Sequence, residues 1–428
     1  MIDVTIDLSV GIGAVGGNFM TLNDPVKGVL DEPLYPLFDP VGPDLIENVA
    51  VGAFSYFVRR GRLTELDQID AGTLAVDLRN HDTMYQFDRA GIDPGRRVRV
   101  ALDGVTIIDG TVEDWNYDYD PSGMSTASFV AVDALGTLAR KDFDEWTALA
   151  SQTAGQRISS ALDRSEVAYP AGSRSIEPGT TQLQGDLVTH GSNVLNYLQL
   201  VARSELGRLF AARDGELTFL DRRTFVYEVS AEFGNDGIPF SGIGPVYGAE
   251  TLYTRVSVDR EGGIAQTVSD ADAVARYGVR TLSLSGLLMD TDADAFSLAA
   301  TLLSLYKSPA VRLQTLSVKL HGLTADQRLI VLSLDIGDAV TVTWTPATVS
   351  LLTDANGVPL TDQYGQALTT VPGTPITQTL FVEGIALSGS ASGEHVCDLS
   401  LSPTQLLPQP FILNDATFGV LDTGRLDY

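Results

Sequence analysis

The chain has 428 residues, of which 44% are hydrophobic, and a formal net charge of −27 at neutral pH. The length and apolar content predict a folded protein of more than one domain, and the acidic charge argues against a nucleic-acid-binding surface or an anionic membrane as partner. Cys397 is the only cysteine, so an intrachain disulfide and a cysteine-based metal site are excluded.

The N-terminal segment, residues 1–46, is expected to form a strand and an arm. Gly11-Ile-Gly-Ala-Val-Gly16 matches the dinucleotide-binding pattern G-x-G-x-x-G. That pattern also requires a helix directly after the glycines, and here the chain continues through a turn-like stretch to Pro25. We therefore interpret the glycines as a turn and expect no dinucleotide cofactor. The acidic N-terminus does not resemble a secretion signal.

Residues 47–138 carry short, regularly spaced strand patterns typical of a small β-barrel. Residues 97–102 alternate cleanly and are separated from the next apolar run by Asp103-Gly104, a strong hairpin signal. A second strand pair flanks the turn at 118–123, with Trp115, Tyr117 and Tyr119 on one arm. Asp118 and Asp120 are interpreted as part of a solvated hairpin tip rather than a catalytic carboxylate pair.

Residues 139–225 predict a compact α/β module. Helix patterns cover 154–167 and 192–206, the second with Ser192 as the expected cap, and a hairpin is expected at Asp214-Gly215.

Residues 226–312 predict a further β-rich domain with short helices, one capped by Ser269. Another helix is entered through Asp290-Thr-Asp-Ala-Asp294, which begins like a calcium-binding loop. The loop's required glycine and glutamate are replaced by Ala295 and Thr301, so helix capping is the preferred interpretation.

Residues 313–404 predict a second β-barrel with a hairpin insertion at 350–375. The order of its patterns repeats that of the first barrel. Gly95-Arg-Arg-Val-Arg-Val100 followed by Ile108-Asp-Gly-Thr-Val112 corresponds to Gly337-Asp-Ala-Val-Thr-Val342 followed by Phe381-Val-Glu-Gly-Ile385. In each case an alternating strand follows.

Residues 405–428 form a C-terminal arm whose sequence echoes the N-terminal arm. Both contain L-N-D-x-x-x-G-V-L-D, with seven of ten positions identical. Two similar barrels with similar arms indicate an approximate internal duplication. The predicted assembly residues are Leu22, Asn23, Asp24, Gly28, Val29, Leu30 and Asp31 in the first arm, and Leu413, Asn414, Asp415, Gly419, Val420, Leu421 and Asp422 in the second.

No motif predicts an enzyme, a cofactor or a metal site. The four histidines are far apart and lack metal-ligand spacing, and neither a nucleophile elbow nor a phosphate-binding loop is present. A site assembled from distant residues is not visible in a sequence, so a hydrolase with a dispersed site stays open as an alternative.

Several segments resemble minor tail proteins of long-tailed (siphovirus) phages of actinobacteria. They are Phe57–Asn80, Gly110-Thr-Val-Glu-Asp-Trp-Asn-Tyr117, Ala275–Leu288, Leu334–Asp338 and Phe418–Asp422. The resemblance covers most of the chain and implies a tail hub similar to the baseplate hub of contractile phage tails. Such a fold is mainly β with α+β insertions.

The resemblance further implies a structural homotrimer whose two barrels per chain give a pseudo-sixfold ring at the distal end of the tail tube. The implied partners are the distal tail ring protein, the tape measure protein and other tail-tip proteins. DNA would pass through the ring without specific binding, which suits an acidic wall. The chain would be made in the host bacterial cytoplasm and end in the virion. The alternative is a β-rich receptor- or carbohydrate-binding tail-tip module.

Overall fold

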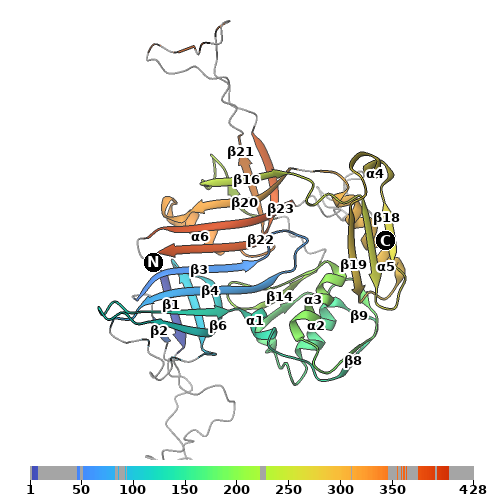
Figure 1. Ribbon diagram of the computed structural model, residues 1–428, viewed down its shortest axis with the longest axis horizontal. Helices are drawn as coiled ribbons and strands as arrows, with labels where there is room; N and C mark the ends of the chain where they lie inside the picture. Colours follow the sequence, from blue (N-terminus) through green and yellow to red (C-terminus); the bar gives the residue numbers. More distant parts are fainter. Residues whose placement is uncertain are drawn as a thin grey trace, which may run out of the picture.

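The structure is a computed structural model that describes residues 2–7, 46–48, 52–81, 85, 92, 94–221, 228–309, 311–345, 354, 358, 360, 361, 363, 375–390 and 393–403. A 13-stranded sheet organises these residues (Figure 1), and its main path runs β16-β20-β23-β22-β3-β4-β7-β6-β5-β1-β2. The mainly β, multi-sheet fold predicted from the sequence is confirmed.

The first half of the large sheet comes from the N-terminal third of the chain and is antiparallel throughout. Its strands are β1 (Ile2–Asp7), β2 (Ile46–Asn48), β3 (Ala53–Gly61), β4 (Asp70–Arg79), β5 (Arg97–Leu102), β6 (Val105–Asp118) and β7 (Thr126–Val132). The expected Asp103-Gly104 hairpin joins β5 to β6, and both residues have positive φ, as a tight two-residue turn requires.

The second half comes from the C-terminal part of the chain. Its strands are β15 (Val229–Phe233), β16 (Gly242–Tyr247), β20 (Val311–Lys319), β21 (Ala339–Trp344), β22 (Ile376–Ser390) and β23 (His395–Pro403). β15 pairs in parallel with β21, which in turn pairs with β22. Helix α6 (Ala325–Ser333) follows β20 after a 3-10 turn, Leu320–Gly322, and buries Val331 and Leu332 in the core.

The two predicted barrels are two halves of one sheet, and the described strands form no closed barrel. One hydrophobic cluster runs through both halves, from Val98 and Phe129 to Val340 and Leu399. The sequence analysis predicted two separate barrels. It could not show that they join, because strand pairing between residues more than 300 positions apart leaves no signal in the local periodicity. The hairpin insertion at 350–375 lies mostly outside the described residues, although Asp354 and Val358 close a turn there.

The α/β module has its own core beside the large sheet, at the lower right of Figure 1. Its helices are α1 (Ala134–Leu138), α2 (Ala154–Leu162) and α3 (Val194–Glu205). Its main strands are β10 (Arg174–Ile176), β13 (Arg208–Ala211) and β14 (Leu217–Leu220), and β13 and β14 form the expected hairpin. Two short pairs complete it, β8 (Trp146–Ala148) with β12 (Asp186–Val188), and β9 (Gln152–Thr153) with β11 (Gln182–Leu183), together with a 3-10 turn, Ala171–Ser173.

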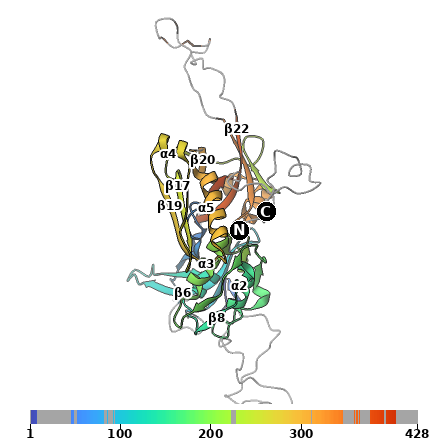
Figure 2. The same cartoon turned by 90° about the vertical axis from the view of Figure 1, so that its right-hand side faces the viewer.

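A third unit contains β17 (Arg255–Arg260), β18 (Gln266–Ser269), β19 (Thr281–Leu287), α4 (Ala271–Tyr277) and α5 (Asp292–Tyr306). Figure 2 shows α5 alongside its three-stranded sheet, and their apolar faces form a separate core. The expected β-rich domain at 226–312 therefore divides, since β15 and β16 join the large sheet.

Helix capping agrees with the expected positions to within one residue. α3 is capped by Asn193 rather than Ser192, and α4 by Asp270 rather than Ser269. Serine caps a helix about as well as asparagine or aspartate does, so the sequence alone did not show which of two neighbouring residues is the cap.

Candidate assembly site

A seam between β3 and β22 joins the two halves of the large sheet. The strands pair antiparallel from Gly61 opposite Gly384 to Ser55 opposite Ser390. Gly61 has φ +87, and a Cβ there would lie 2.3 Å from the backbone oxygen of Glu383. Only glycine meets both conditions, so the seam depends on this residue.

The two halves have the same strand order. β5-β6-β7-β4-β3 in the first half corresponds to β21-β22-β23-β20-β16 in the second. Gly95 N–H donates to Val112 O at 2.7 Å, and Gly337 N–H donates to Val382 O at 2.8 Å, so these pairs occupy equivalent positions. In both halves a β-bulge follows directly, after Val112 in β6 and after Val382 in β22.

This register corrects one detail of the predicted repeat. The sequence comparison matched Gly110 with Gly384, whereas the hydrogen bonds match Val112 with Val382. Gly384 therefore corresponds to Asp114, four positions further along than expected. The order of elements was correct, but an isolated glycine in a strand was too weak a marker of register.

Glu383, the bulged residue of β22, has no exposed surface and is surrounded by hydrogen-bond donors. Arg62 Nε and Arg208 Nη2 donate to its two carboxylate oxygens at 2.7 and 2.8 Å. Ser402 Oγ donates at 2.5 Å. Burial opposes ionisation of this carboxyl, but the two guanidinium groups outweigh it and lower its pKa to about 2. The site is thus a buried, fully charged cluster.

This cluster connects three parts of the chain at one point. Glu383 belongs to the second half, Arg62 follows β3 of the first half, and Arg208 begins β13 of the α/β module. The Arg62 N–H also donates to the Glu383 backbone oxygen at 2.9 Å. Removal of one charged side chain would leave the remaining charges buried without an oppositely charged partner, which would lower the stability of the fold.

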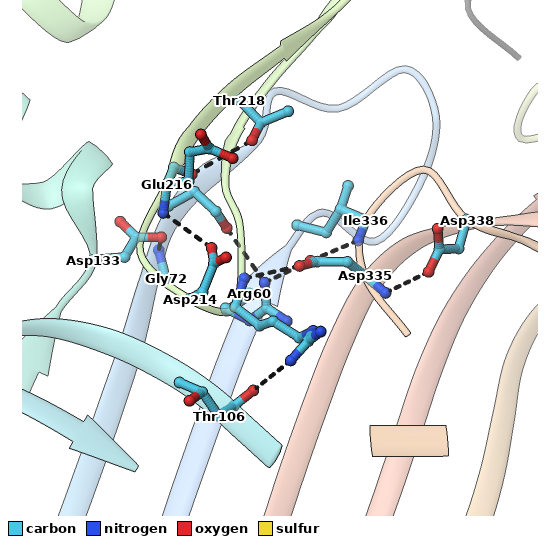
Figure 3. A network of polar contacts seen from close by, with 12 residues as sticks. Arg60, Gly72, Thr106, Asp133, Asp214, Glu216, Thr218, Asp335, Ile336 and Asp338 are labelled. Carbon is cyan, nitrogen blue, oxygen red and sulfur yellow. Dashed lines mark hydrogen bonds and ion pairs between the residues drawn. The ribbon is translucent and has the colours of Figure 1, made fainter. Parts of the chain in front are cut away.

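A second polar network is centred on Arg60 of β3 and Asp335 (Figure 3). Arg60 Nη1 donates to Asp335 Oδ1 at 2.7 Å and to the Ala211 backbone oxygen at 3.3 Å. The Arg213 backbone N–H donates to Asp335 Oδ2 at 2.8 Å. The carboxylate of Asp335 therefore holds the α/β module against both halves.

Asp133 lies near this network and organises the local backbone. Its carboxylate accepts from Gly72 N–H at 2.7 Å and caps α1 through Leu135 and Gly136. Burial raises the pKa of Asp133 to about 6 despite these hydrogen bonds. We assign it a structural role, because all of its described partners are structural.

A pocket of about 410 Å³ lies between loop 62–69, α3, α5 and the end of β23. Its lining combines six leucine side chains with polar and charged residues that include Arg62, Arg203 and Arg208. A smaller pocket of about 210 Å³ contains His321, His395 and the ion pair between Arg328 and Asp103. No described group of three or more His, Cys, Asp or Glu side chains could hold a metal ion.

The predicted assembly residues of both arms lie outside the described residues, as does Gly11–Gly16. The aspartates at 290–294 belong to a capped helix start, where Thr291 and Asp294 form a capping box. Asp120 accepts from Ser122 N–H at the hairpin tip, as expected. Among the described residues, no helix is long and apolar enough to cross a bilayer.

The sequence analysis did not single out Glu383 or Asp335. One signal was available for Glu383: a carboxylate within the otherwise apolar stretch Phe381–Ile385. A buried charge in such a strand needs partners, but the sequence does not show that they come from residues 62 and 208.

The fold as a whole is similar to those of two tail proteins of known structure. The 43 kDa tail protein of prophage MuSo2 from Shewanella oneidensis is similar with a TM-score of 0.52 and 17% identity, over 85% of this chain and 96% of that one. A tail protein from Neisseria meningitidis MC58 is similar with a TM-score of 0.56 and 13% identity, over 85% and 95%.

No protein-family model matches the chain, and no curated protein matches it by sequence. The chain has the fold of these two tail proteins over nearly their whole length. The resemblance to tail proteins expected from the sequence is thereby confirmed at the level of the fold.

Proposed function

We propose that this protein is a structural tail hub of a bacteriophage virion. In this role it forms a homotrimeric ring with pseudo-sixfold symmetry at the distal end of the tail tube, connects the tube to the tip, and lets DNA pass. The observation that carries the proposal is the repeated strand order of two halves within one sheet. Three chains then supply six similar units, which can match sixfold components on one side and threefold components on the other.

The charge and the polar clusters support a structural role. A net charge of −27 disfavours binding of the DNA backbone, so passing DNA would not be retained on the wall of the ring. The buried carboxylate of Glu383 and the partly exposed carboxylate of Asp335 join parts of the chain through ion pairs and hydrogen bonds. We therefore propose no catalytic activity. The partners in this role are other copies of the chain, the distal tail ring protein, the tape measure protein and further tail-tip proteins.

A direct test is the mass of the purified protein by light scattering across a range of concentrations. The proposal predicts a trimer, and a monomer at all accessible concentrations would contradict it. A zymogram on purified host cell wall should show no clearing; clearing would favour a hydrolase with a dispersed site.

A carbohydrate-binding tail-tip module is the second candidate, because of one observation. Trp115 and Tyr117 of β6 and Tyr119 just after it stack in a row, with neighbouring ring centroids 6.4 and 6.2 Å apart. Rows of aromatic rings can bind sugars. A glycan-array signal that is lost in Trp115→Ala would support this function, and absence of any signal from the wild type would remove it.

A further inference from the structure

The pocket of about 410 Å³ lies where three parts of the chain meet. Loop 62–69 connects β3 to β4 of the large sheet, α3 belongs to the α/β module and α5 to the third unit, and each supplies part of the lining. Ile69 and Leu209 of the lining belong to the core of the α/β module, and Leu284 and Leu302 belong to that of the third unit. The pocket is therefore a feature of the junction between units.

Three leucines from three different elements line this pocket and are only half-buried. Leu66 lies in the loop, Leu206 is the C-cap of α3 and Leu305 lies on α5. All three pack at the margin of the core of the third unit. Apolar surface that is gathered in a concave site is favourably covered by another apolar group. The lining therefore suits an apolar occupant.

The charged residues of the lining do not favour a charged ligand. Arg62 and Arg208 are ion-paired with Glu383, and Glu65 is ion-paired with an arginine of β20. The two other charged lining residues are exposed and opposite in sign, and these are Arg203 and Asp67. Because the less exposed charges are already paired, an uncharged occupant fits this pocket better than an anion or a cation.

The described part of the chain ends at this pocket. Pro403, the last residue of β23, is one of its lining residues. The residues that follow, Thr404-Gln-Leu-Leu-Pro-Gln-Pro-Phe-Ile412, include no charged side chain. Leu406 and Leu407 come three and four residues after Pro403, so a fully extended chain carries them at most about 10–14 Å from it. Two large apolar side chains are thus tethered within reach of the half-buried leucines.

We propose that residues 404–412 occupy this pocket of their own chain, with Leu406 and Leu407 covering its leucines. Pro408 and Pro410 favour an extended backbone in the residues that precede them, which reduces the conformational entropy lost on docking. The docked segment links the large sheet to the α/β module and the third unit, and it fixes the point from which the predicted C-terminal assembly residues extend. This contact goes beyond the proposed function, because it forms within one chain and does not require a ring.

Protection of a cysteine in the pocket tests the proposal in the full-length chain. Leu305→Cys places a thiol in the lining, whereas the native Cys397 is 1% exposed and should stay unreactive while the sheet is folded. Leu406→Asp/Leu407→Asp, added to this variant, replaces the apolar contact by two charges and should prevent docking. The rate of thiol labelling at position 305 should then rise by a factor of roughly ten or more, which corresponds to a docking free energy of at least about 1.4 kcal/mol.

Two controls separate docking from other effects of the substitutions. Leu413→Asp/Leu421→Asp makes the same two changes further along the terminal segment and should leave the labelling rate at position 305 unchanged. Ile264→Cys should react at one rate with every version of the segment, because Ile264 is 73% exposed and is not part of the pocket lining. Equal labelling at position 305 with the native leucines and with the two aspartates in their place would overturn the proposal.

A bis-maleimide cross-link shows which chain supplies the segment. In Arg203→Cys/Gln405→Cys one thiol lies on the exposed rim of the pocket and the other lies between Pro403 and the two leucines, so all the leucines are kept. The expected product is a cross-linked single chain, which migrates faster than the unmodified chain in denaturing electrophoresis. Covalent dimers or trimers would show that a neighbouring copy supplies the segment, and these, like the absence of any cross-linked species, would contradict docking within the chain. Light scattering tests the proposed ring separately, since this docking is expected in a monomer and in a trimer alike.

Discussion

Replacement of Glu383 by glutamine tests whether the charged cluster at the seam holds the halves together. The folded protein lowers the pKa of Glu383 from 4.5 to about 2, so ionised Glu383 contributes about 3 kcal/mol to stability above pH 4.5. The contribution is lost as the pH falls through the folded value. Breaking a buried ion pair costs roughly 3–5 kcal/mol, which agrees with this magnitude. Glu383→Gln should therefore destabilise the seam by about 3 kcal/mol at neutral pH.

The assay follows exposure of Cys397 to a thiol reagent in increasing urea. Cys397 lies on β23, next to β22, and burial raises its thiol pKa to about 12, so it reacts only after the sheet opens. Asp109→Asn is the matched control. Asp109 is also buried and bound to two arginines, but Arg97 and Arg99 are 62% and 47% exposed and water can solvate them. Asp109→Asn should lower the free energy of unfolding by about 1 kcal/mol or less. Equal effects of the two variants would refute the reasoning.

Four further predictions concern the seam glycine, two other buried side chains and the C-terminal segment. Gly61→Ala should lower the free energy of unfolding by roughly 3 kcal/mol or more, because the added Cβ would clash with the backbone of the seam. Gly104 has φ +83 but open space around it, so Gly104→Ala should lower that free energy by only about 1 kcal/mol in the same urea titration. Arg157→Lys should cost roughly 2–4 kcal/mol by thermal unfolding, since this fully buried guanidinium donates to four acceptors that an ammonium cannot all reach. Folding raises the pKa of Asp133 from 3.8 to about 6, so the contribution of this carboxyl to folding stability is present below pH 4 and is lost as the pH rises through 6. The stability of the wild type relative to Asp133→Asn should therefore fall by about 3 kcal/mol between pH 4 and the region above pH 6. A stability difference that does not change with pH would contradict the assignment. Deletion of residues 412–428 should weaken ring formation in light scattering, and an unchanged trimer would remove the arms from the account.

Local patterns predicted most of the individual elements. The alternation at 97–102, the Asp103-Gly104 turn and the apolar stripe of α3 each depend on nearby residues, and the structure has β5, the β5–β6 hairpin and α3 there. The repeat was visible for the same reason, because strand patterns keep their order after duplication.

The sequence did not reveal how the repeats are joined. β3 and β22 are more than 300 residues apart, and pairing at that separation depends on the whole fold. The Glu383 cluster was missed because its three charged members come from three different parts of the chain. The predicted assembly arms lie outside the described residues, so their role stays a prediction.

The most direct test of the ring is negative-stain electron microscopy of the purified protein. The account predicts end-on class averages with threefold symmetry and six similar lobes around a central opening, since each chain supplies two equivalent halves. Single particles with no ring, or rings whose number of lobes is not twice the number of chains, would contradict it.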